Sequence, residues 1–265
     1  MIIGKAISPF SIKRRNGGGG GGNDADAQAF ITASGISGTN ATAINTLVVN
    51  LKSASIWTKM KALYPMVGGT ATSCKFNLKD SRDLDAAFRL SFIGGATFSA
   101  NGIQFNGTNS YADTFLTPNA IINNNHLSFY SRTDVNLTQV DMGTTNATNV
   151  LDIESRITNL CYSNSSNAAL LNYANTSSLG FYINSRTSAA SFKAFKNGLL
   201  KATSLTGTTT TMPFNIFIGA RNGSPLYYSS KQCAFASIGD GLTDAEALAL
   251  YNAVQTFNTT LLRNV

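Results

Sequence analysis

A pair of acidic side chains in the stretch VLDIES, residues 150–155, comes nearest to a catalytic arrangement in this sequence. Alternate side chains of a strand point to one face, so Asp152 and Glu154 would face the same way. Paired carboxyl groups hydrolyse glycosides, and the retaining form of that reaction needs them about 5–5.5 Å apart. The alternative interpretation is two carboxylates on a solvated strand or loop.

Other residue types that could do chemistry are few. His126 is the only histidine, which excludes any site that needs two imidazoles, and we interpret it as a polar residue at the start of a strand. The 13 carboxylates are scattered and form no recognisable catalytic triad. The three cysteines have neither disulfide-framework nor metal-ligand spacing and are predicted to be small buried hydrophobes: Cys74, Cys161 and Cys233.

Aromatic side chains could bind a sugar without reacting with it. A sugar site stacks a ring on an exposed aromatic side chain and holds the hydroxyls with amides. The stretch GSPLYYSS places Tyr227 and Tyr228 in a predicted loop before the last strand. Both are candidates for glycan contact, and packing against the rim of the fold is the alternative.

Six consecutive glycines, residues 17–22, separate a short arm from the rest of the chain. The run has no trailing Lys-Ser or Lys-Thr and does not follow a strand, so it is a linker and not a phosphate loop. The arm, residues 1–16, is apolar and basic and would gain its order from a partner. Its predicted anchoring residues are Ile3, Lys5, Ile7, Phe10, Lys13, Arg14 and Arg15.

The charge is low and unevenly placed. Charged residues make up 12% of the chain, and its net charge is +7. Four of its 20 Lys and Arg residues stand in the first 15 positions. A basic arm could meet nucleic acid, an acidic membrane or an acidic protein; we expect a protein partner and no specific nucleic-acid binding. No apolar run of about 18 residues occurs, so we expect no membrane insertion. No signal-peptide pattern opens the chain, so we expect synthesis in the cytoplasm.

Hydrophobic spacing predicts helices at the start and end and strands between them. A helix capped by Asn23 or Asp24 is expected to end near Gly35, and a second from Thr39 or Asn40 to Pro65. Residues 68–241 show short alternating runs, and we expect strands at HLSFYSR, LGFYINSR and FNIFIGAR, each with one face buried. The dipeptide Asn197-Gly198 predicts a two-residue hairpin turn.

A capping box, Thr243 to Glu246, followed by apolar residues on one face predicts the last helix. It is expected to lie against the β body. A long β region followed by a helix that packs on its outside predicts a mainly β fold. We expect a two-sheet β-sandwich with helical additions at both ends.

Several motifs occur in the order seen in a known family. The stretches GGATFSANGIQFNGTNSYADTF, FKNGLL, FNIFIGARNG and FASIGDGLTDAEALALYNAVQTF resemble a concanavalin A-like or laminin G-like jelly-roll domain. The segment 57–92, preceded by DADAQAF, is similar to bacteriophage tail or virion proteins that carry this sandwich. The implied organisation is an anchoring arm (1–16), a linker (17–22), a helical segment (23–66) and a lectin-like sandwich with the C-terminal helix (67–265).

The resemblance also bears on chemistry. Laminarinase-like members of this fold place a nucleophilic Glu two residues before the supporting Asp, where this chain has Val150, so we expect no enzyme. Laminin G-like domains often bind calcium, for which Asp141 and Asp240 are possible ligands. No clustered acidic array supports them, so we expect no cofactor.

The sequence thus predicts a bacteriophage virion structural protein, attached to the tail or capsid surface by its arm and in contact with other virion proteins. A homo-oligomer, with a trimer as our guess, and contact with glycans of the host surface are expected. Its location would be the virion, after synthesis in the host cytoplasm. The alternative is a carbohydrate-binding module, and a divergent glycoside hydrolase ranks third.

Overall fold

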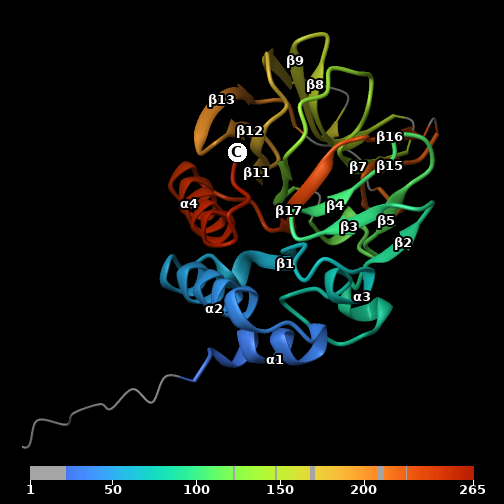
Figure 1. Cartoon of the computed structure of the whole chain (residues 1–265). Helices are drawn as coiled ribbons and strands as arrows, with labels where there is room; N and C mark the ends of the chain where they lie inside the picture. Colours follow the sequence, from blue (N-terminus) through green and yellow to red (C-terminus); the bar gives the residue numbers. More distant parts are fainter. Residues whose placement is uncertain (1–21, 122, 147, 168–170, 208–211, 225) are drawn as a thin grey trace, which may run out of the picture.

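The computed structural model describes residues 22–121, 123–146, 148–167, 171–207, 212–224 and 226–265 (Figure 1). Its centre is formed by two sheets in which all strand pairs are antiparallel except β15 with β7. The eight-stranded sheet has the order β13 (Leu199–Ser204), β12 (Ser191–Lys196), β11 (Gly180–Ser188), β6 (Asn125–Ser131), β17 (Gln232–Gly239), β4 (Gly102–Gln104), β3 (Thr97–Ser99), with β1 (Met60–Tyr64) on β17.

The second sheet faces the first and will carry the candidate site. It is nine-stranded, with the order β10 (Leu171–Ala174), β9 (Leu160–Asn167), β8 (Val150–Ile157), β7 (Met142–Thr145), β14 (Phe217–Ile218), β5 (Tyr111–Asp113), β2 (Ser91–Ile93). Two short strands lie off this path: β15 (Ala220–Asn222) pairs with β7, and β16 (Tyr227–Tyr228) pairs with β15.

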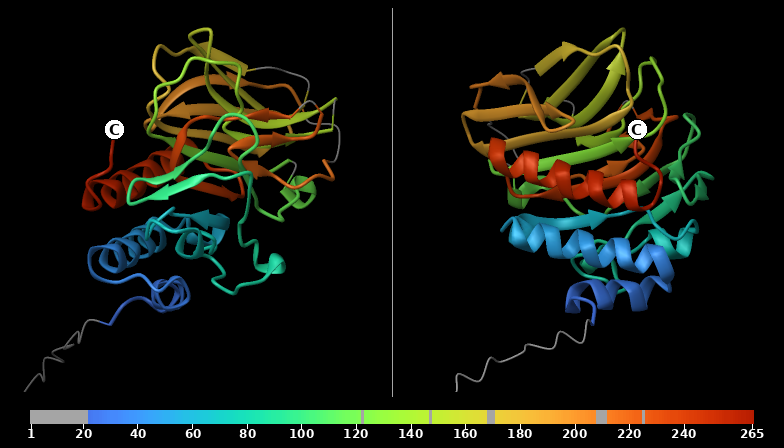
Figure 2. Two further views of the ribbon diagram at one scale, coloured as in Figure 1. Left: turned by 45° about the vertical axis from the view of Figure 1, so that its right-hand side comes forward. Right: turned by 60° about the vertical axis from the view of Figure 1, so that its left-hand side comes forward.

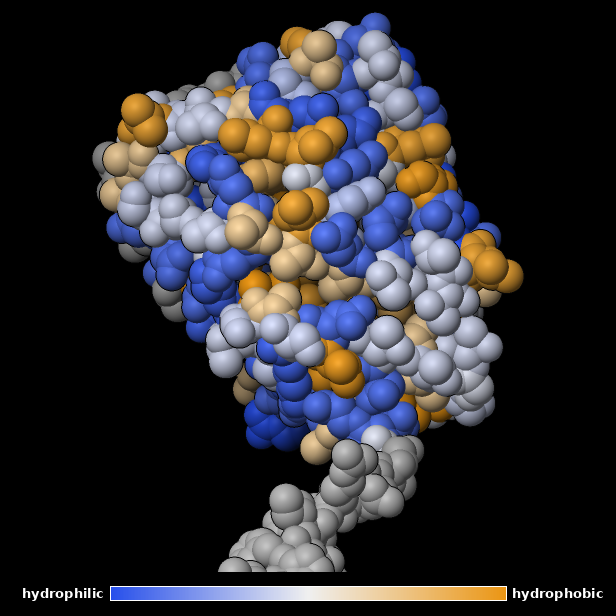
Figure 3. All heavy atoms as spheres, turned by 90° about the vertical axis from the view of Figure 1, so that its left-hand side faces the viewer, coloured by the Kyte–Doolittle hydropathy of each residue, from blue (hydrophilic) through white to orange (hydrophobic). Residues whose placement is uncertain are grey.

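Helices cover one side of the sandwich (Figure 2). The α-helices are α1 (Ala25–Ser34), α2 (Gly38–Ser53), α3 (Ala71–Cys74) and α4 (Asp244–Thr260), and the short 3₁₀ helices are η1 (Trp57–Lys59), η2 (Asp85–Ala87) and η3 (Pro118–Ile121). α1, α2 and α4 form one apolar cluster with the outer face of the eight-stranded sheet. The outward surface beside them mixes polar and apolar side chains (Figure 3).

The space between the sheets is filled by a second apolar cluster. It takes Leu127 and Phe129 from β6 and Leu151 and Ile153 from β8, all fully buried. Burying an aliphatic or aromatic side chain of this size contributes about 1.5–3 kcal/mol. The predicted two-sheet β-sandwich with a C-terminal helix is therefore confirmed.

The helix boundaries follow the predicted caps at three ends. Asp24 caps α1 by accepting a hydrogen bond from the Asp26 amide, and Gly35 ends it in the left-handed region at φ 68°. The predicted capping box of the last helix is present, with Thr243 and Glu246 each bonding the other's backbone. α4 lies against the β body as expected, because Leu250 and Val254 belong to the apolar cluster over the sheet.

The prediction that the second helix continues to Pro65 is wrong. α2 ends at Ser53, and after a turn with Ser55 at φ 59° the chain enters strand β1. β1 pairs with β17 along the register from Met60 to Tyr64. Sheet pairing therefore overrides the helical spacing of Trp57, Met60 and Leu63 in the sequence. Part of the segment 23–66 thus belongs to the sheet.

The strand predictions hold with two differences. The Asn197-Gly198 hairpin joins β12 to β13, with φ 51° and 74° at the two positions. β6 and the first seven residues of β11 are buried on both faces, because helices cover the side that was predicted to be exposed. In the stretch FNIFIGAR only Phe217 and Ile218 form β14, while Phe214 lies outside it and is 46% exposed.

The cysteines are buried and unpaired as predicted, at Cys74, Cys161 and Cys233. His126 lies at the start of β6, where its two ring nitrogens contact the Asp240 carbonyl and the Ser237 hydroxyl. No helix in the described part of the chain is long and apolar enough to span a membrane.

Candidate functional site

A hollow of about 150 Å³ lies on the outer face of the nine-stranded sheet, beside β8 and the β15–β16 pair. It is smaller than the roughly 300–1,000 Å³ of sites for drug-sized ligands. Charged, amide, hydroxyl and aromatic groups converge on it. Its lining residues are Thr138, Gln139, Val140, Glu154, Ile157, Arg221 and Tyr227.

Strand alternation on β8 delivers the two acids to this face. Leu151 and Ile153 point into the core, so Asp152 and Glu154 point to the outer side, as the sequence predicts. The interpretation as solvated carboxylates is wrong, because the side chain of Asp152 is 0% exposed and that of Glu154 is 14% exposed. Asn164, directly opposite on β9, donates a hydrogen bond of 2.8 Å to Asp152.

A glycine opens the space over these acids. Gly143 on β7 adjoins Asp152, and a Cβ added there would lie 2.4 Å from the Asp152 Cβ. Because Gly143 carries no side chain, nothing at this position blocks the Arg221 guanidinium. Arg221 reaches across from β15, which pairs with β7 at Gly143. Arg221 Nη1 lies 3.3 Å from Asp152 Oδ2 and 3.7 Å from Glu154 Oε1.

The other side of Arg221 meets an aromatic ring. The Arg221 guanidinium lies over the ring of Tyr227, 4.8 Å from its centroid, and the two residues are register partners of β15 and β16. Such cation–π contacts contribute about 0.5–2 kcal/mol. The contact fixes the ring at the wall of the hollow, and Tyr227 remains partly exposed.

Only one of the two acids carries its charge at neutral pH. Burial and the neighbouring Asp152 raise the pKa of Glu154 to about 9. Burial also raises the pKa of Asp152, against the opposing effects of Asn164 and Arg221. We infer that Glu154 is protonated and that Asp152 is the ion that faces Arg221. The cluster of two acids and one arginine is then neutral.

This protonation predicts a pH dependence of stability. The Glu154 pKa is raised from 4.5 to about 9 on folding, so its contribution is complete below pH 4.5 and is lost as the pH rises toward 9. Between pH 6.5 and 8.5 we expect the free energy of unfolding to fall with a slope of up to about 1.4 kcal/mol per pH unit. Glu154→Gln should flatten that slope in urea unfolding curves.

The pH window separates Glu154 from the other buried groups. Burial lowers the pKa of His126 from 6.5 to about 4, so its contribution changes only below this window. Burial raises the pKa of the Cys74 thiol from 9.0 to about 11, which acts above it. Equal slopes for the wild type and Glu154→Gln would show that Glu154 is ionised in the folded protein.

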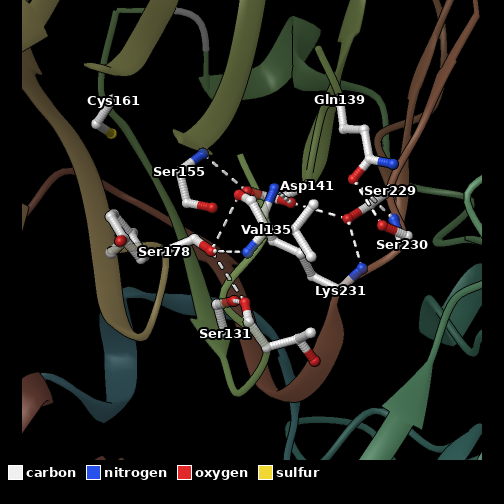
Figure 4. A network of polar contacts seen from close by, with 12 residues as sticks. Ser131, Val135, Gln139, Asp141, Ser155, Cys161, Ser178, Ser229, Ser230 and Lys231 are labelled. Atoms are coloured by element: carbon white, nitrogen blue, oxygen red, sulfur yellow. Dashed lines mark hydrogen bonds and ion pairs between the residues drawn. The ribbon is translucent and has the colours of Figure 1, made fainter. Parts of the chain in front are cut away.

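Beneath the hollow, the sheets are joined by an ion pair with no exposed surface (Figure 4). Lys231 Nζ lies 3.0 Å from Asp141 Oδ1, which also accepts from the Ser229 hydroxyl. Asp141 Oδ2 accepts from the Ser155 amide at 2.8 Å.

Asp141, considered as a calcium ligand from the sequence, thus faces a lysine, while Asp240 pairs with Lys61. Within the described ranges no group of three or more His, Cys, Asp or Glu could hold a metal ion.

The remaining sequence candidates fall in two places. Tyr227 and Tyr228 form the short strand β16 instead of a loop, and only Tyr227 lines the hollow. The anchoring residues Ile3, Lys5, Ile7, Phe10, Lys13, Arg14 and Arg15 lie outside the described residues.

Sequence reasoning missed Arg221. Its stretch, GARNG, shows only a strand end followed by a turn, and nothing local indicates that the arginine reaches two acids about 70 positions earlier. An unusual feature that could have signalled it is Gly143, a glycine inside a predicted β region, because such a glycine marks a close approach of other atoms.

The sequence and the structure were compared with known proteins. No protein-family model matches the sequence, and no curated protein sequence gives a significant match. Among solved structures, the chain resembles domain 4 of AbnA, a GH43 extracellular arabinanase from Geobacillus stearothermophilus, in complex with arabinotriose. That likeness has a TM-score of 0.50 and 13% identity, and covers 72% of this chain and 98% of the domain.

Two botulinum neurotoxin structures are also similar. The binding domain of neurotoxin DC in complex with rat synaptotagmin II matches with a TM-score of 0.53 and 11% identity, covering 76% of this chain and 53% of that one. A structure of neurotoxin type C, whose cell entry depends on interaction with two ganglioside molecules, matches with a TM-score of 0.51 and 13% identity, covering 77% and 53%. The chain thus spans about half the length of these toxin chains. At such identities the likenesses show a shared β-sandwich fold.

Proposed function

We propose that the sandwich is a carbohydrate-binding domain and that the hollow at Glu154, Arg221 and Tyr227 holds a sugar ring. The observation that carries the proposal is the convergence of a protonated carboxyl, a guanidinium and a ring face on one small hollow. Gln139 and Thr138 add an amide and a hydroxyl to its wall. A sugar offers an apolar C–H face to an aromatic ring and hydroxyls to polar groups, so each part of the wall has a partner.

The solved structures support this proposal at the level of the fold. Arabinotriose is bound to the arabinanase domain, and gangliosides interact with neurotoxin type C. Neurotoxin DC shows that the same fold also meets a protein, synaptotagmin II. The neutral polar cluster in this chain favours a glycan over a protein ligand, because a small hollow with few convergent polar groups suits a small ring.

We propose binding without catalysis. Asp152 has no exposed surface and is bound by Asn164 and Arg221, so it does not meet a substrate as one of the two flanking carboxyl groups of retaining hydrolysis. Arg221 also lies within 4 Å of both and occupies the position beside them. The position two residues before Asp152 is Val150, which has no nucleophile to offer.

A glycan array with the purified protein tests the binding proposal. We expect Arg221→Ala to lower the affinity for the bound glycan about 10- to 100-fold, since hydrogen bonds to charged groups contribute about 1.5–3 kcal/mol. Tyr227→Ala should weaken it about 10-fold by removing the ring. Arg82→Ala is the matched control, because Arg82 is 66% exposed and, among the described residues, forms its ion pair with Asp80. Binding that survives both hollow variants would place the site elsewhere, and hydrolysis of the bound glycan would contradict the absence of catalysis.

We also infer a structural role in a bacteriophage particle, with the arm as the anchor. The similarity of residues 57–92 to virion proteins and the glycine run before the helices support it. Deleting residues 1–16 should leave a folded protein that binds glycans as before but no longer enters particles, measured by mass spectrometry of purified virions. A trimer is expected by sedimentation. Normal incorporation of the truncated protein would remove the anchoring role.

A further inference from the structure

The outer face of the nine-stranded sheet continues beyond the hollow. Gly143 on β7 is paired with Arg221 of β15 and also with Phe217 of β14. Directly paired residues of neighbouring strands point to the same side of a sheet. Phe217 therefore lies on the same face as Arg221, across the space that Gly143 leaves empty.

Three aromatic side chains, Tyr111, Phe217 and Tyr228, form what we name the aromatic platform on this face. Tyr111 and Phe217 are stacked, with ring centroids 4.3 Å apart and planes at 21°. Tyr228 lies 6.3 Å from Tyr111, at an angle of 38°. Phe217 is only 8% exposed and serves as the floor, while Tyr111 and Tyr228 are partly exposed.

Polar groups border the platform on its β5 side. The Asn215 amide donates to both oxygens of Asp113, at 3.1 and 3.3 Å, and the Phe115 amide donates to the same carboxylate. A carboxylate has about four acceptor positions, so Asp113 can still accept from a hydroxyl. The Asn222 amide, bonded to the Asn215 carbonyl, closes the border.

The platform and the hollow are neighbours across the β15–β16 pair. Tyr227 lines the hollow and Tyr228, the next residue of β16, belongs to the platform, so the two rings lie on opposite sides of this short pair of strands. Of the strands concerned, β5, β7, β15 and β16 are labelled in Figure 1, where they lie together. Because the hollow is about 150 Å³, it has room for a single ring, and a longer glycan must leave it over the neighbouring surface.

We propose that the aromatic platform is a second subsite, on which the next ring of the same glycan stacks, so that the domain recognises a chain of two or more sugar rings. This inference rests on the proposed glycan-binding function. It adds a selection for chain length: the hollow fixes one ring through polar groups, and the platform holds the next ring by its apolar face. The Asp113 carboxylate accepts a hydrogen bond from a hydroxyl of that second ring.

Calorimetric titration with arabino-, cello- and N-acetylglucosamine oligosaccharides of one to six rings tests the platform. For the series that the wild type binds, we expect the affinity to rise at least 10-fold from one ring to two or three rings and then to level off. Tyr111→Ala should remove most of this rise, whereas Tyr111→Phe should keep it because the stack remains. Tyr228→Ala is a second, independent variant on the exposed edge of the platform.

The outcomes separate the two proposals. An affinity independent of chain length would leave the hollow as the glycan site and overturn the second subsite. A rise with chain length that survives both Tyr111→Ala and Tyr228→Ala would also overturn it. Binding of no sugar in the three series or on the array would overturn the proposed function, and the second subsite with it.

Discussion

Replacing Lys231 with methionine is expected to lower the free energy of unfolding by about 3–5 kcal/mol, because it leaves the Asp141 carboxylate buried without its cation. Both side chains are 0% exposed. Asp141 stands just before β7 in one sheet and Lys231 just before β17 in the other, so the pair joins the two sheets. Methionine is close to lysine in length, so the cost is mainly electrostatic and not a cavity. Urea unfolding monitored by circular dichroism measures it.

A double-mutant cycle with Asp141→Asn gives the coupling within this pair. Asparagine keeps an oxygen for the Ser155 amide but removes the charge, so the second substitution should cost less once the first is made. We expect a coupling energy of about 2–3 kcal/mol. Simple addition of the two single effects would show that the charges do not interact. Arg82→Ala serves again as the exposed reference, with an expected effect below about 1 kcal/mol.

The elements that sequence predicted best are those with a local signature. Asp24, Gly35 and the Thr243–Glu246 box mark helix ends through contacts within a few residues, and Asn197-Gly198 marks a turn in the same way. β1 was misread because its residues satisfy a helical spacing while their hydrogen-bond partners, in β17, lie about 175 positions later. A short apolar run does not reveal such a partner.

Only part of the candidate site can be predicted from the sequence. Alternation placed Asp152 and Glu154 on one face, which the structure confirms, but their burial depends on Arg221 and on β15 crossing over Gly143. Alternation therefore predicts the geometry within one strand correctly but not the burial that comes from distant strands. Tyr227 was found from composition, whereas Tyr111 was not, because its stacking partner Phe217 comes from a distant strand.

Buried cations recur in this chain where helices and sheets meet. Arg186 and Arg263 are both 0% exposed, and neither lies within ion-pair distance of a carboxylate in the described ranges. Burial lowers the pKa of each to about 10, so both stay charged at neutral pH. Backbone carbonyls take the place of counter-ions: Arg186 donates to those of Ser165, Ala189 and Thr206. A low content of charged residues is thus compatible with charges that act inside the fold.

Arg263 is the more demanding case, and Arg263→Ala is expected to lower the free energy of unfolding by about 3–5 kcal/mol. Its guanidinium donates to the carbonyls of Pro65, Met66, Ala100 and Ala234 and to the Asn258 side chain, at 2.6–3.2 Å. Each buried carbonyl left without a partner costs about 1–3 kcal/mol, reduced where water enters the space. The melting temperature should fall by about 10 °C in calorimetry.

A lysine at this position separates charge from hydrogen-bond geometry. Arg263→Lys keeps the positive charge but has three donors on one atom, which cannot span four carbonyls that come from β17 and from the turns after β1 and β3. We therefore expect Arg263→Lys to lose most of the stability that Arg263→Ala loses. A lysine variant as stable as the wild type would mean that the buried charge alone holds the end of α4 to the eight-stranded sheet. The fork of five N–H groups would then be incidental to the fold.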